Sequence, residues 1–299
     1  MSASAETIVF LHIPKTAGAT LQKILERKCG RDRILSFDGH DHRAGIERFK
    51  KLPEQERAQY RLIQGHVRFG LHRFVPGKCS YITFLREPIA RALSFYHYAR
   101  TVPDHYLYRR INEDGATLKT LLAQKATPEL FNLQTRMIAG DEWDNLRREV
   151  DGEALERAQE NLRAHFSFVG LTEEFDASIS LLGRTFGWSF PFYVKRNVTA
   201  RKPHTSSVDA ETRSLLCDAN AFDLKLYEYA RNLFEAQRRA GGVAFESELR
   251  RFQRLNRVWS FAYESYETIR RGVAHLVGRR IAKGPPVETL RHIESDSSI

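Results

Sequence analysis

A lysine, a glycine and two threonines lie close together near the amino terminus, at Lys15, Gly18, Thr16 and Thr20. They separate the apolar run 8–13 from an amphipathic segment at 20–27, a pattern that predicts a strand, a tight loop and a helix. Because the first turn of a helix has unpaired N–H groups and a positive dipole end, this loop would bind an anion, and Lys15 would add a full charge. In the P-loop of nucleoside triphosphate enzymes the lysine follows the last glycine, but here it precedes Gly18. The residues therefore predict an anion site of a different type, although a simple capped turn is also compatible with them.

A second candidate anion site follows the apolar run 81–85. Arg86 stands there, where Mg²⁺-dependent phosphoryl-transfer enzymes generally have an acidic residue after a strand. An arginine repels Mg²⁺ and binds phosphate through two parallel hydrogen bonds. Pro88 suits the start of a helix, and Ser94 lies about two turns from Arg86. Arg86 and Ser94 could therefore bind a second phosphate, remote from the first, while Glu87 keeps a metal-dependent kinase open as an alternative.

Strands and helices alternate along the chain up to residue 240. Further strands are predicted at 62–67 and 166–171, and helices at 43–61, 88–100, 175–186 and, capped by Asp209, 209–239. Residues 101–165 are expected to be mainly helical and to cover the site, and 195–207 to form a loop. This alternation predicts an α/β fold with a mostly parallel central sheet, which binds ligands at the carboxyl ends of its strands. The two anion sites and the loop after 62–67 would then meet in one crevice.

Gly241 and Gly242 mark a break, after which one more long helix is predicted. Its apolar residues form a sevenfold repeat over 245–276, with Phe245, Phe252, Trp259, Tyr266 and Val273 in one set and Leu255, Ala262, Ile269 and Leu276 in the other. Large aromatic residues favour packing against the chain's own helices. A coiled-coil homodimer and, because arginines lie nearby, membrane-surface binding stay open. We therefore divide the chain into a domain at 1–240, a helical extension at 241–283 and a disordered tail at 284–299.

Composition limits the partners but does not choose among them. The chain of 299 residues has 47 Lys and Arg against 37 Asp and Glu, a formal charge of +10, which favours phosphorylated cofactors, acidic glycans, membranes or nucleic acid. No recognised nucleic-acid motif accompanies this charge, so we do not expect nucleic acid as a partner. The three cysteines match no metal-site spacing. Neither a signal-peptide pattern nor an apolar run of about 20 residues is present, so a cytoplasmic location is expected.

Together these segments resemble the carbohydrate sulfotransferases related to the heparan sulfate and uronyl 2-O-sulfotransferases, and their bacterial relatives. Residues 12–18, HIPKTAG, are similar to the family's 5′-phosphosulfate loop, and residues 85–96, LREPIARALSFY, to its 3′-phosphate motif. Weaker similarity continues at 64–67, 131–136, 168–174 and 201–203. The resemblance implies a P-loop-like three-layer α/β fold and the use of 3′-phosphoadenosine 5′-phosphosulfate (PAPS), with adenosine 3′,5′-bisphosphate (PAP) as the product and no metal.

The resemblance also implies roles for individual residues. The 5′-phosphosulfate would be held by Pro14, Lys15, Thr16, Ala17, Gly18, Ala19 and Thr20, the 3′-phosphate by Arg86 and Ser94, and Lys202 with Thr205 could close over the nucleotide. Lys15 would stabilise charge on the leaving phosphate oxygen, and His66 would take the proton of the acceptor hydroxyl. The 2-O-sulfotransferases have a histidine ahead of the glycine as well, where this chain has Gln64. His66 is therefore the one candidate base, and the resemblance does not by itself imply a uronic-acid acceptor.

Three functions are compatible with the sequence. The first is a sulfotransferase acting on a carbohydrate hydroxyl. The candidate residues that could meet an anionic sugar acceptor are Arg68, His72, Arg73, Arg91, His97 and Arg136. The second is a P-loop-like nucleotide kinase, which would require Mg²⁺ and be stabilised by ATP. The third is a non-catalytic module that binds acidic glycan or membrane through its basic surface, and its binding would depend strongly on salt but not on Lys15.

Overall fold

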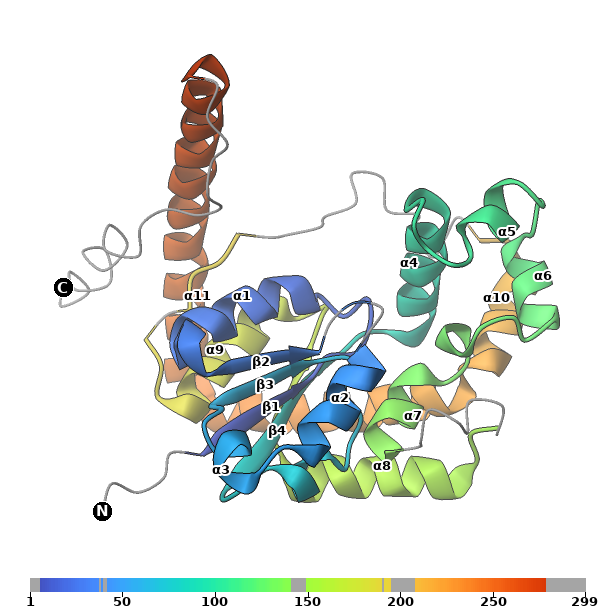
Figure 1. The fold of residues 1–299 in the computed structure, drawn as a ribbon, viewed down its shortest axis with the longest axis horizontal. Coiled ribbons are helices and arrows are strands. Elements are labelled where there is room, and N and C mark those ends of the chain that lie inside the picture. The colour runs from blue at the N-terminus through green and yellow to red at the C-terminus, as the bar shows by residue number, and fades with distance from the viewer. Residues whose placement is uncertain are drawn as a thin grey trace.

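The computed structural model describes residues 6–37, 39, 42–140, 149–189, 191–194 and 208–277. Its centre is a five-stranded sheet composed of β1 (Thr7–Leu11), β2 (Ile34–Phe37), β3 (Leu62–Gly65), β4 (Cys79–Leu85) and β5 (Phe166–Leu171). The strands lie in the order β2-β3-β1-β4-β5, and each neighbouring pair is parallel (Figure 1). The predicted α/β fold with a parallel sheet is confirmed, whereas strand β2 was not predicted.

Continuous apolar character explains why the central strands form a parallel sheet. Every residue of β1 is buried, and successive side chains of a strand point to opposite faces. Both faces of the sheet are therefore covered, as is usual for parallel sheets. In register, Val9 of β1 lies between Ile63 of β3 and Tyr81 of β4, and all three are buried.

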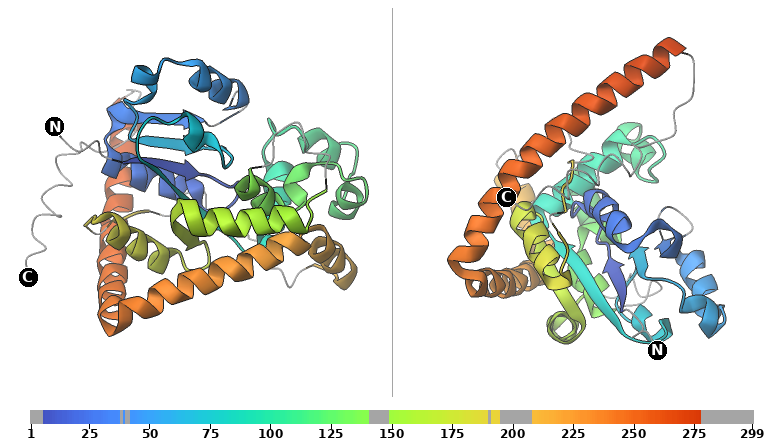
Figure 2. Two further views of the ribbon diagram at one scale, coloured as in Figure 1. Left: turned by 90° about the horizontal axis from the view of Figure 1, so that it is seen from below. Right: turned by 90° about the vertical axis from the view of Figure 1, so that its left-hand side faces the viewer.

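Helices connect the strands and flank the sheet (Figures 1 and 2). Their bounds are α1 (Gly18–Cys29), α2 (His42–Lys51), α3 (Glu54–Arg57), α4 (Pro88–Thr101), α5 (Tyr108–Asn112), α6 (Leu118–Ala123), α7 (Leu133–Ala139), α8 (Gly152–His165), α9 (Phe175–Phe186), α10 (Ala210–Ala219) and α11 (Ala221–Val277). The helices predicted after β1, β4 and β5 are present as α1, α4 and α9. The segment 43–61 forms two helices because Pro53, at the N-cap of α3, cannot continue α2.

Part of the helical region forms a second apolar cluster beside the main core. Helices α4, α5, α6 and α10 contribute to it, with Phe95, Leu121, Leu130 and Leu216 among its buried residues. Since α4 begins directly after β4, this cluster fixes the direction in which the helix with Ser94 leaves the sheet. The region between residues 101 and 140 is helical as predicted.

The carboxyl-terminal helices differ from the prediction in one respect. The helix predicted at 209–239 is divided at Asn220, whose buried side chain donates a hydrogen bond to the carbonyl of Leu130 at 3.0 Å. Asp209 caps α10 as predicted, because its carboxylate accepts from the N–H of Thr212 at 3.0 Å. The predicted break is confirmed at Gly242 (φ 58°, ψ −156°), where α11 bends sharply, as Figure 2 shows.

The sevenfold repeat beyond this bend is buried only at its start. Phe245, Leu249 and Phe252 are buried in the same core as the sheet, so the predicted packing against the chain's own core is confirmed there. Farther along the repeat, Tyr266 and Ile269 are 44% and 67% exposed. The predicted domain boundary at residue 240 lies beside the Gly242 bend, yet one core contains side chains from both sides of it.

Among the described residues, no helix combines the length and the apolar character needed to cross a membrane. Cys29, Cys79 and Cys217 are free thiols. The loop predicted at 195–207 and the tail predicted at 284–299 lie outside the described residues.

Candidate active site

The loops that follow β1, β3 and β4 meet at the carboxyl edge of the sheet. Because β1 lies between β3 and β4, its loop is flanked by both neighbours, the usual ligand position in such sheets. The Arg86 guanidinium, after β4, donates a hydrogen bond to the carbonyl of Lys15 at 3.1 Å. On the other side, His66 Nδ1, after β3, lies 2.9 Å from the carbonyl oxygen of His12. The predicted convergence of the three loops is confirmed, and Arg86 lies directly beside the Lys15 loop.

The loop before α1 has an unusual backbone. Lys15 and Ala17 have positive φ angles of 73° and 62°, a conformation that non-glycine residues adopt only at a cost of about 1–3 kcal/mol. Ala17 is the N-cap of α1 and has no side-chain oxygen, and the first turn of the helix contains no acidic residue. The first turn of α1 therefore has no acidic side chain to balance the positive end of the helix dipole. This arrangement favours the binding of an anion.

Gly18 and Thr16 support the shape of this loop. A Cβ atom on Gly18 would lie 1.8 Å from Nε2 of His12, so the glycine is required by the histidine ring that packs against it, and not only by an approaching oxyanion. Thr16 is fully buried, and its hydroxyl donates to the carbonyl of Ile13 at 2.8 Å. Pro14 and Ala19 are partly buried beside them. Thr20, in the first turn of α1, is 5% exposed.

Two cations are held close together at this edge. Burial, and then the nearby charge of Arg86, lower the pKa of Lys15 to about 8. Burial also lowers the pKa of Arg86, an effect that the charges of Glu173 and Glu87 oppose. The Lys15 ammonium lies 4.0 Å from the centre of the Tyr98 ring on α4. The site therefore concentrates positive charge where water is partly excluded, which strengthens its attraction for an anion.

Ser94 lies on the same face of α4 as Tyr98, since the two are four residues apart on one helix. Because Tyr98 contacts Lys15, the predicted partner of Arg86 is on the α4 surface that faces the loop. Tyr98 was not among the predicted residues. Sequence patterns gave no signal for it, because an aromatic residue on a helix is usually a packing residue.

Three histidines gather beside the loop, of which only His66 was predicted. The ring of His66 stacks on His12 with 4.6 Å between centres, and His42 lies edge-on at 6.1 Å. Since a carbonyl can only accept, the contact with the carbonyl of His12 places the proton of His66 on Nδ1 and leaves the lone pair on Nε2. Burial, and then the charges of His66 and Lys15, lower the pKa of His12 far below its usual range. Burial is also the main cause that lowers the pKa of His42.

Comparison with known proteins assigns this site to a family. The model of the galactose-3-O-sulfotransferase family matches residues 2–270. The chain belongs to this family. The resemblance to carbohydrate sulfotransferases that the loops indicated is therefore confirmed.

Individual relatives of this family member agree with that assignment. Galactose-3-O-sulfotransferase 3 of Homo sapiens is 28% identical over 270 residues, which cover 82% of this chain and 60% of the relative. Heparan sulfate 2-O-sulfotransferase 1 of Gallus gallus is 25% identical over 258 residues, covering 76% of this chain and 70% of the relative. A solved structure of the mouse sulfotransferase SULT7A1 complexed with PAP is 16% identical over 79% of this chain and 89% of that one, with a TM-score of 0.26 that is too low to support an argument. The chain spans about 60% of the length of the galactose-3-O-sulfotransferases that it matches.

In this galactose-3-O-sulfotransferase family member, most of the predicted acceptor residues do not line the site. Arg91 has no exposed surface and donates to the carbonyl of Glu129 at 2.6 Å, so it serves the fold. Arg136 is 3% exposed and Arg68 is 7% exposed. His72 lies near the amino end of β4, where its Nδ1 is 3.2 Å from the hydroxyl of Tyr81.

Four further predicted residues have still to be located in the structure. His97 is half-buried on α4, one turn after Ser94, and Arg73 is exposed. Lys202 and Thr205 lie outside the described residues. Of the acceptor candidates, His97 and Arg68 are therefore the two that stand near the site, because Arg68 follows His66 by two residues.

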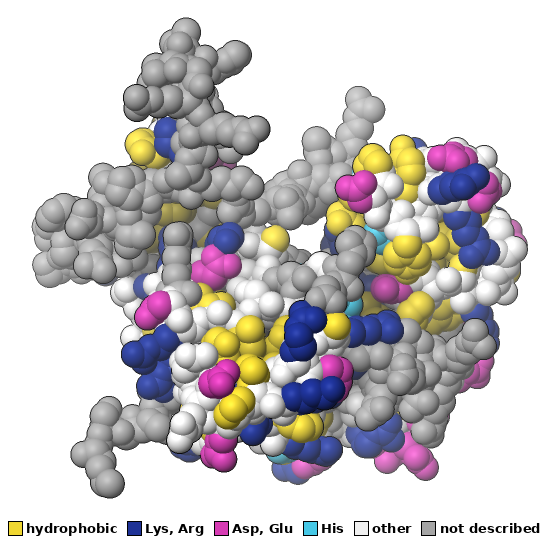
Figure 3. All heavy atoms as spheres, in the orientation of Figure 1, with side chains coloured by type: hydrophobic (Ala, Val, Ile, Leu, Met, Phe, Trp, Pro, Cys, Tyr) yellow, Lys and Arg dark blue, Asp and Glu magenta, His cyan; other side chains and the backbone are white. Residues whose placement is uncertain are grey.

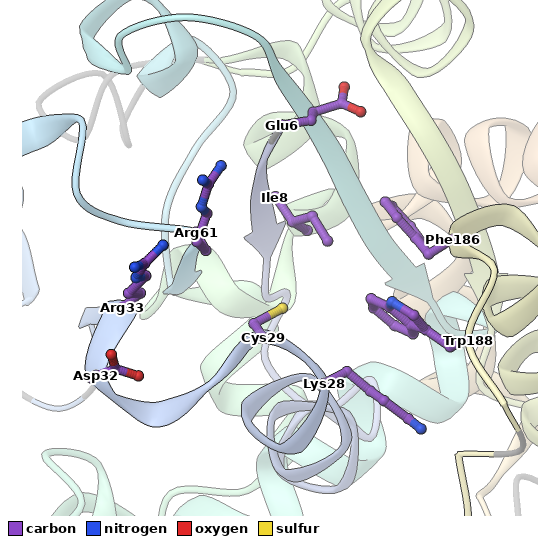
Figure 4. Close-up of a pocket in the computed structure, with 9 residues that line it drawn as sticks. All are labelled: Glu6, Ile8, Lys28, Cys29, Asp32, Arg33, Arg61, Phe186 and Trp188. Atoms are coloured by element: carbon purple, nitrogen blue, oxygen red, sulfur yellow. The ribbon is translucent and has the colours of Figure 1, made fainter. Parts of the chain in front are cut away.

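A separate cavity lies at the opposite, amino edge of the sheet, and Figure 4 shows the side chains around it. They come from the start of β1, the end of α1, the residues just before β2 and β3, and the end of α9 with the segment after it, and include Lys28, Arg61 and Trp188. On the face of the molecule drawn in Figure 3, lysine and arginine side chains are interspersed with acidic ones and form no continuous patch. That face therefore offers no support for a module that binds only through a basic surface.

Proposed function

We propose that this protein is a PAPS-dependent sulfotransferase that acts on a hydroxyl of a carbohydrate. The observation that carries the proposal is the contact between Arg86 and the carbonyl of Lys15, 3.1 Å long, at the positive end of α1. It joins two motifs that are 71 positions apart in the sequence into one cationic site. Membership of the galactose-3-O-sulfotransferase family supports the same reaction.

The residues present fit a nucleotide with phosphate groups at both its 3′ and 5′ positions. Lys15 and the N–H groups at the start of α1 would hold the 5′-phosphosulfate, and Arg86 with Ser94 the 3′-phosphate, while Lys202 and Thr205 stay predictions. The lowered pKa of Lys15, which burial and Arg86 cause, shows that two cations share this region at an energetic cost. A bound polyanion would offset that cost. When bound, PAPS would supply an activated sulfuryl group.

The chain's own groups would perform two tasks in the transfer. Lys15 and the first N–H groups of α1 would stabilise the negative charge that develops on the departing phosphate oxygen. His66 would orient the acceptor hydroxyl and accept its proton on Nε2, because Nδ1 is already bonded to the carbonyl of His12. The same carbonyl would stabilise the imidazolium that forms.

We further propose that the acceptor hydroxyl belongs to a neutral sugar such as a galactoside. Two of the arginines that could meet an anionic sugar are buried, since Arg91 and Arg136 are 0% and 3% exposed. Gln64, which stands where the 2-O-sulfotransferases have a histidine, is 1% exposed and donates to the hydroxyl of Ser36 at 3.0 Å, away from the loop. Sulfate transfer to a neutral galactoside should therefore exceed transfer to a uronic-acid polymer, and the reverse preference would contradict this part of the proposal.

No feature of the described residues favours the kinase alternative. The carboxylate of Glu87, the residue that kept a metal site open, caps α4 by accepting from the N–H groups of Ile89 and Ala90 at 3.1 and 2.6 Å. Calorimetric titration with PAP in the presence of EDTA tests the proposal directly. Tight binding without a metal is expected. Binding that requires Mg²⁺, or that ATP outcompetes, would favour a kinase, and failure of PAP to bind at all would refute the sulfotransferase.

We also propose that the exposed part of α11 binds an anionic membrane surface. Val258, Phe261 and Ile269 lie on one face and are 69%, 74% and 67% exposed. Arg254 and Arg257 lie among them, as on helices that bind membrane surfaces. The cytoplasmic location inferred from the sequence stays a prediction.

Vesicle sedimentation tests this surface. The protein should sediment with vesicles that contain phosphatidylserine, and substitution of Val258, Phe261 and Ile269 by serine should abolish this without affecting PAP binding. A dimer that forms without lipid and is dissociated by the same substitutions would identify a second copy as the occupant and overturn the membrane proposal.

A further inference from the structure

A buried glutamine outside the predicted site holds the backbone of Arg86. Gln134, on α7, has no exposed surface. Its side-chain amide donates to the carbonyl of Arg86 at 2.9 Å, and its side-chain oxygen accepts from the N–H of Arg86 at 3.0 Å. Both backbone groups of Arg86 are thus bound by one side chain. Because Arg86 is the first residue after β4, these two bonds replace those that the sheet would otherwise supply.

Gln134 is in turn held by the start of α11. Asp223, which is fully buried, accepts from the N–H groups of Gln134 and Thr135 at 3.1 and 2.7 Å, and so caps α7. In return, Asn132 at the N-cap of α7 accepts from the N–H of Asp223 at 3.0 Å. The two helices therefore cap each other, and the position of Gln134 is fixed on both the backbone and the side-chain end.

The buried charge of Asp223 is balanced within the fold. Burial raises the pKa of Asp223, whereas the charge of the fully buried Arg91 and the N–H donors of α7 lower it. Arg91 lies in α4, five residues after Arg86, and contributes to this balance instead of to a ligand site. The hydrogen bonds of Asp223 to the start of α7 therefore remain in place although its charge is buried.

We infer that Gln134 is a positioning residue for nucleotide binding, which acts by fixing the backbone of Arg86 so that its guanidinium reaches the 3′-phosphate beside the Lys15 loop. This inference rests on the proposed function. Gln134 has no exposed surface, so it does not touch the nucleotide itself. Its effect should therefore appear only in the contribution of the 3′-phosphate, and only while the Arg86 side chain is present.

The test compares the affinity for PAP with the affinity for adenosine 5′-phosphate, which lacks the 3′-phosphate. In Gln134→Met, which keeps the size of the side chain and removes both bonds, the dissociation constant for PAP should rise about tenfold because two buried backbone groups lose their partner. The constant for adenosine 5′-phosphate should change less than about twofold, because that nucleotide does not use Arg86. Arg86→Ala should cause the same selective loss, and adding Gln134→Met to it should cause no further loss.

Two further variants keep the test decisive. Gln134→Glu retains the acceptor for the N–H of Arg86 but places a carboxylate against its carbonyl, and should show the same selective loss if Gln134→Met does not fold. Asn161→Leu is the matched control, because the amide of Asn161 donates to the carbonyl of Ile138 at 2.8 Å, at the opposite end of α7. It should lower the melting temperature and leave the preference for PAP over adenosine 5′-phosphate unchanged.

The outcomes separate this inference from the proposed function. Wild-type protein that binds no PAP would refute the sulfotransferase, and this inference with it. Wild-type protein that prefers PAP, with the preference lost in Arg86→Ala but kept in both Gln134 variants, would overturn the inference alone. An equal loss in Asn161→Leu would show that Gln134 only stabilises α7, which would also overturn it.

Discussion

The two edges of the sheet carry the same types of cationic side chain in opposite electrostatic surroundings. At the carboxyl edge, Lys15 precedes the amino end of α1, where the helix dipole is positive. At the amino edge, Lys28 lies in the last turn of the same helix, where the dipole is negative, and its ammonium donates to the hydroxyl of Ser189 at 3.2 Å. One lysine therefore compensates the helix, and the other adds to its positive charge. A lysine at the amino end of a helix adds positive charge where the dipole is already positive. Such a lysine is evidence for an anionic ligand.

The histidines show the same contrast. His66, at the carboxyl edge, has its Nδ1 bonded to a backbone carbonyl, which directs Nε2 away from the strand. His72, at the amino edge, lies against Tyr81 and stacks on His165 with 5.1 Å between ring centres. His72 is thus bound by hydrogen bonding to Tyr81 and by ring stacking within the fold, whereas the Nδ1 contact of His66 leaves its Nε2 for proton transfer. The following predictions test this difference.

Removal of the Lys15 charge should have the largest effect. Lys15→Ala should lower the turnover number at least about 100-fold, because the developing charge on the leaving oxygen loses its main cation. The measurement is the rate of PAP release with saturating PAPS and a galactoside acceptor. Lys28→Ala, at the other end of α1, is the control and should retain wild-type turnover within about twofold. Comparable losses in both variants would mean that the two edges are not functionally distinct.

His66→Ala should lower turnover about 100-fold, within the range of a lost general base, while PAP binding persists. His72→Ala supplies the control at the opposite edge, with turnover close to that of the wild type. Rates and PAP titrations on both variants distinguish a role in chemistry from a role in binding. Near-normal turnover in His66→Ala would exclude it as the base and direct attention to His42.

PAP affinity should decrease as the pH rises through about 8, since burial and Arg86 lower the pKa of Lys15 to that value. Below this pH the lysine is charged and attracts the nucleotide, and above it the charge is lost. A single proton linked to binding predicts a rise of about fivefold in the dissociation constant between pH 8 and 9. Lys15→Arg should abolish this dependence, because arginine stays charged in this range. A wild-type profile that is flat across these values would contradict the assignment.

The sequence was sufficient for the elements whose apolar pattern is long or continuous. The strand over 166–171 and the helix over 175–186 were predicted with the bounds of β5 and α9. Strand β2 was missed because it has four residues, of which only Phe37 is fully buried. The division between α10 and α11 was also missed. It depends on Asn220, whose side chain is bound by a carbonyl 90 positions away in the sequence.

Dependence on contacts between residues distant in the sequence also decides which site residues could be predicted. Lys15 and Arg86 come just after predicted strands and His66 lies at the end of a third, and the rule that such positions converge in a parallel sheet was enough to bring them together. Arg91 was misjudged as an acceptor residue because its burial, and the nearby charge of Asp223 from a distant part of the sequence, become visible only in the fold. Gln134 lies in the segment 131–136 that resembles the family, yet the resemblance gave it no role, since a buried amide that bonds to backbone can be recognised only when the fold places it.

The smallest expected effect is on the free energy of unfolding. Removing the lysine charge should change it differently at the two ends of α1. In the absence of nucleotide, Lys28→Met should lower the free energy of unfolding by about 0.3–1 kcal/mol, because a cation in the last turn stabilises the helix dipole. Lys15→Met should not lower it, since the fold disfavours that charge, as its lowered pKa of about 8 indicates. Urea denaturation at pH 7 measures both. If the two variants lose the same free energy, the charge of Lys15 is already compensated within the chain, and the main physical reason to expect an anion beside it disappears.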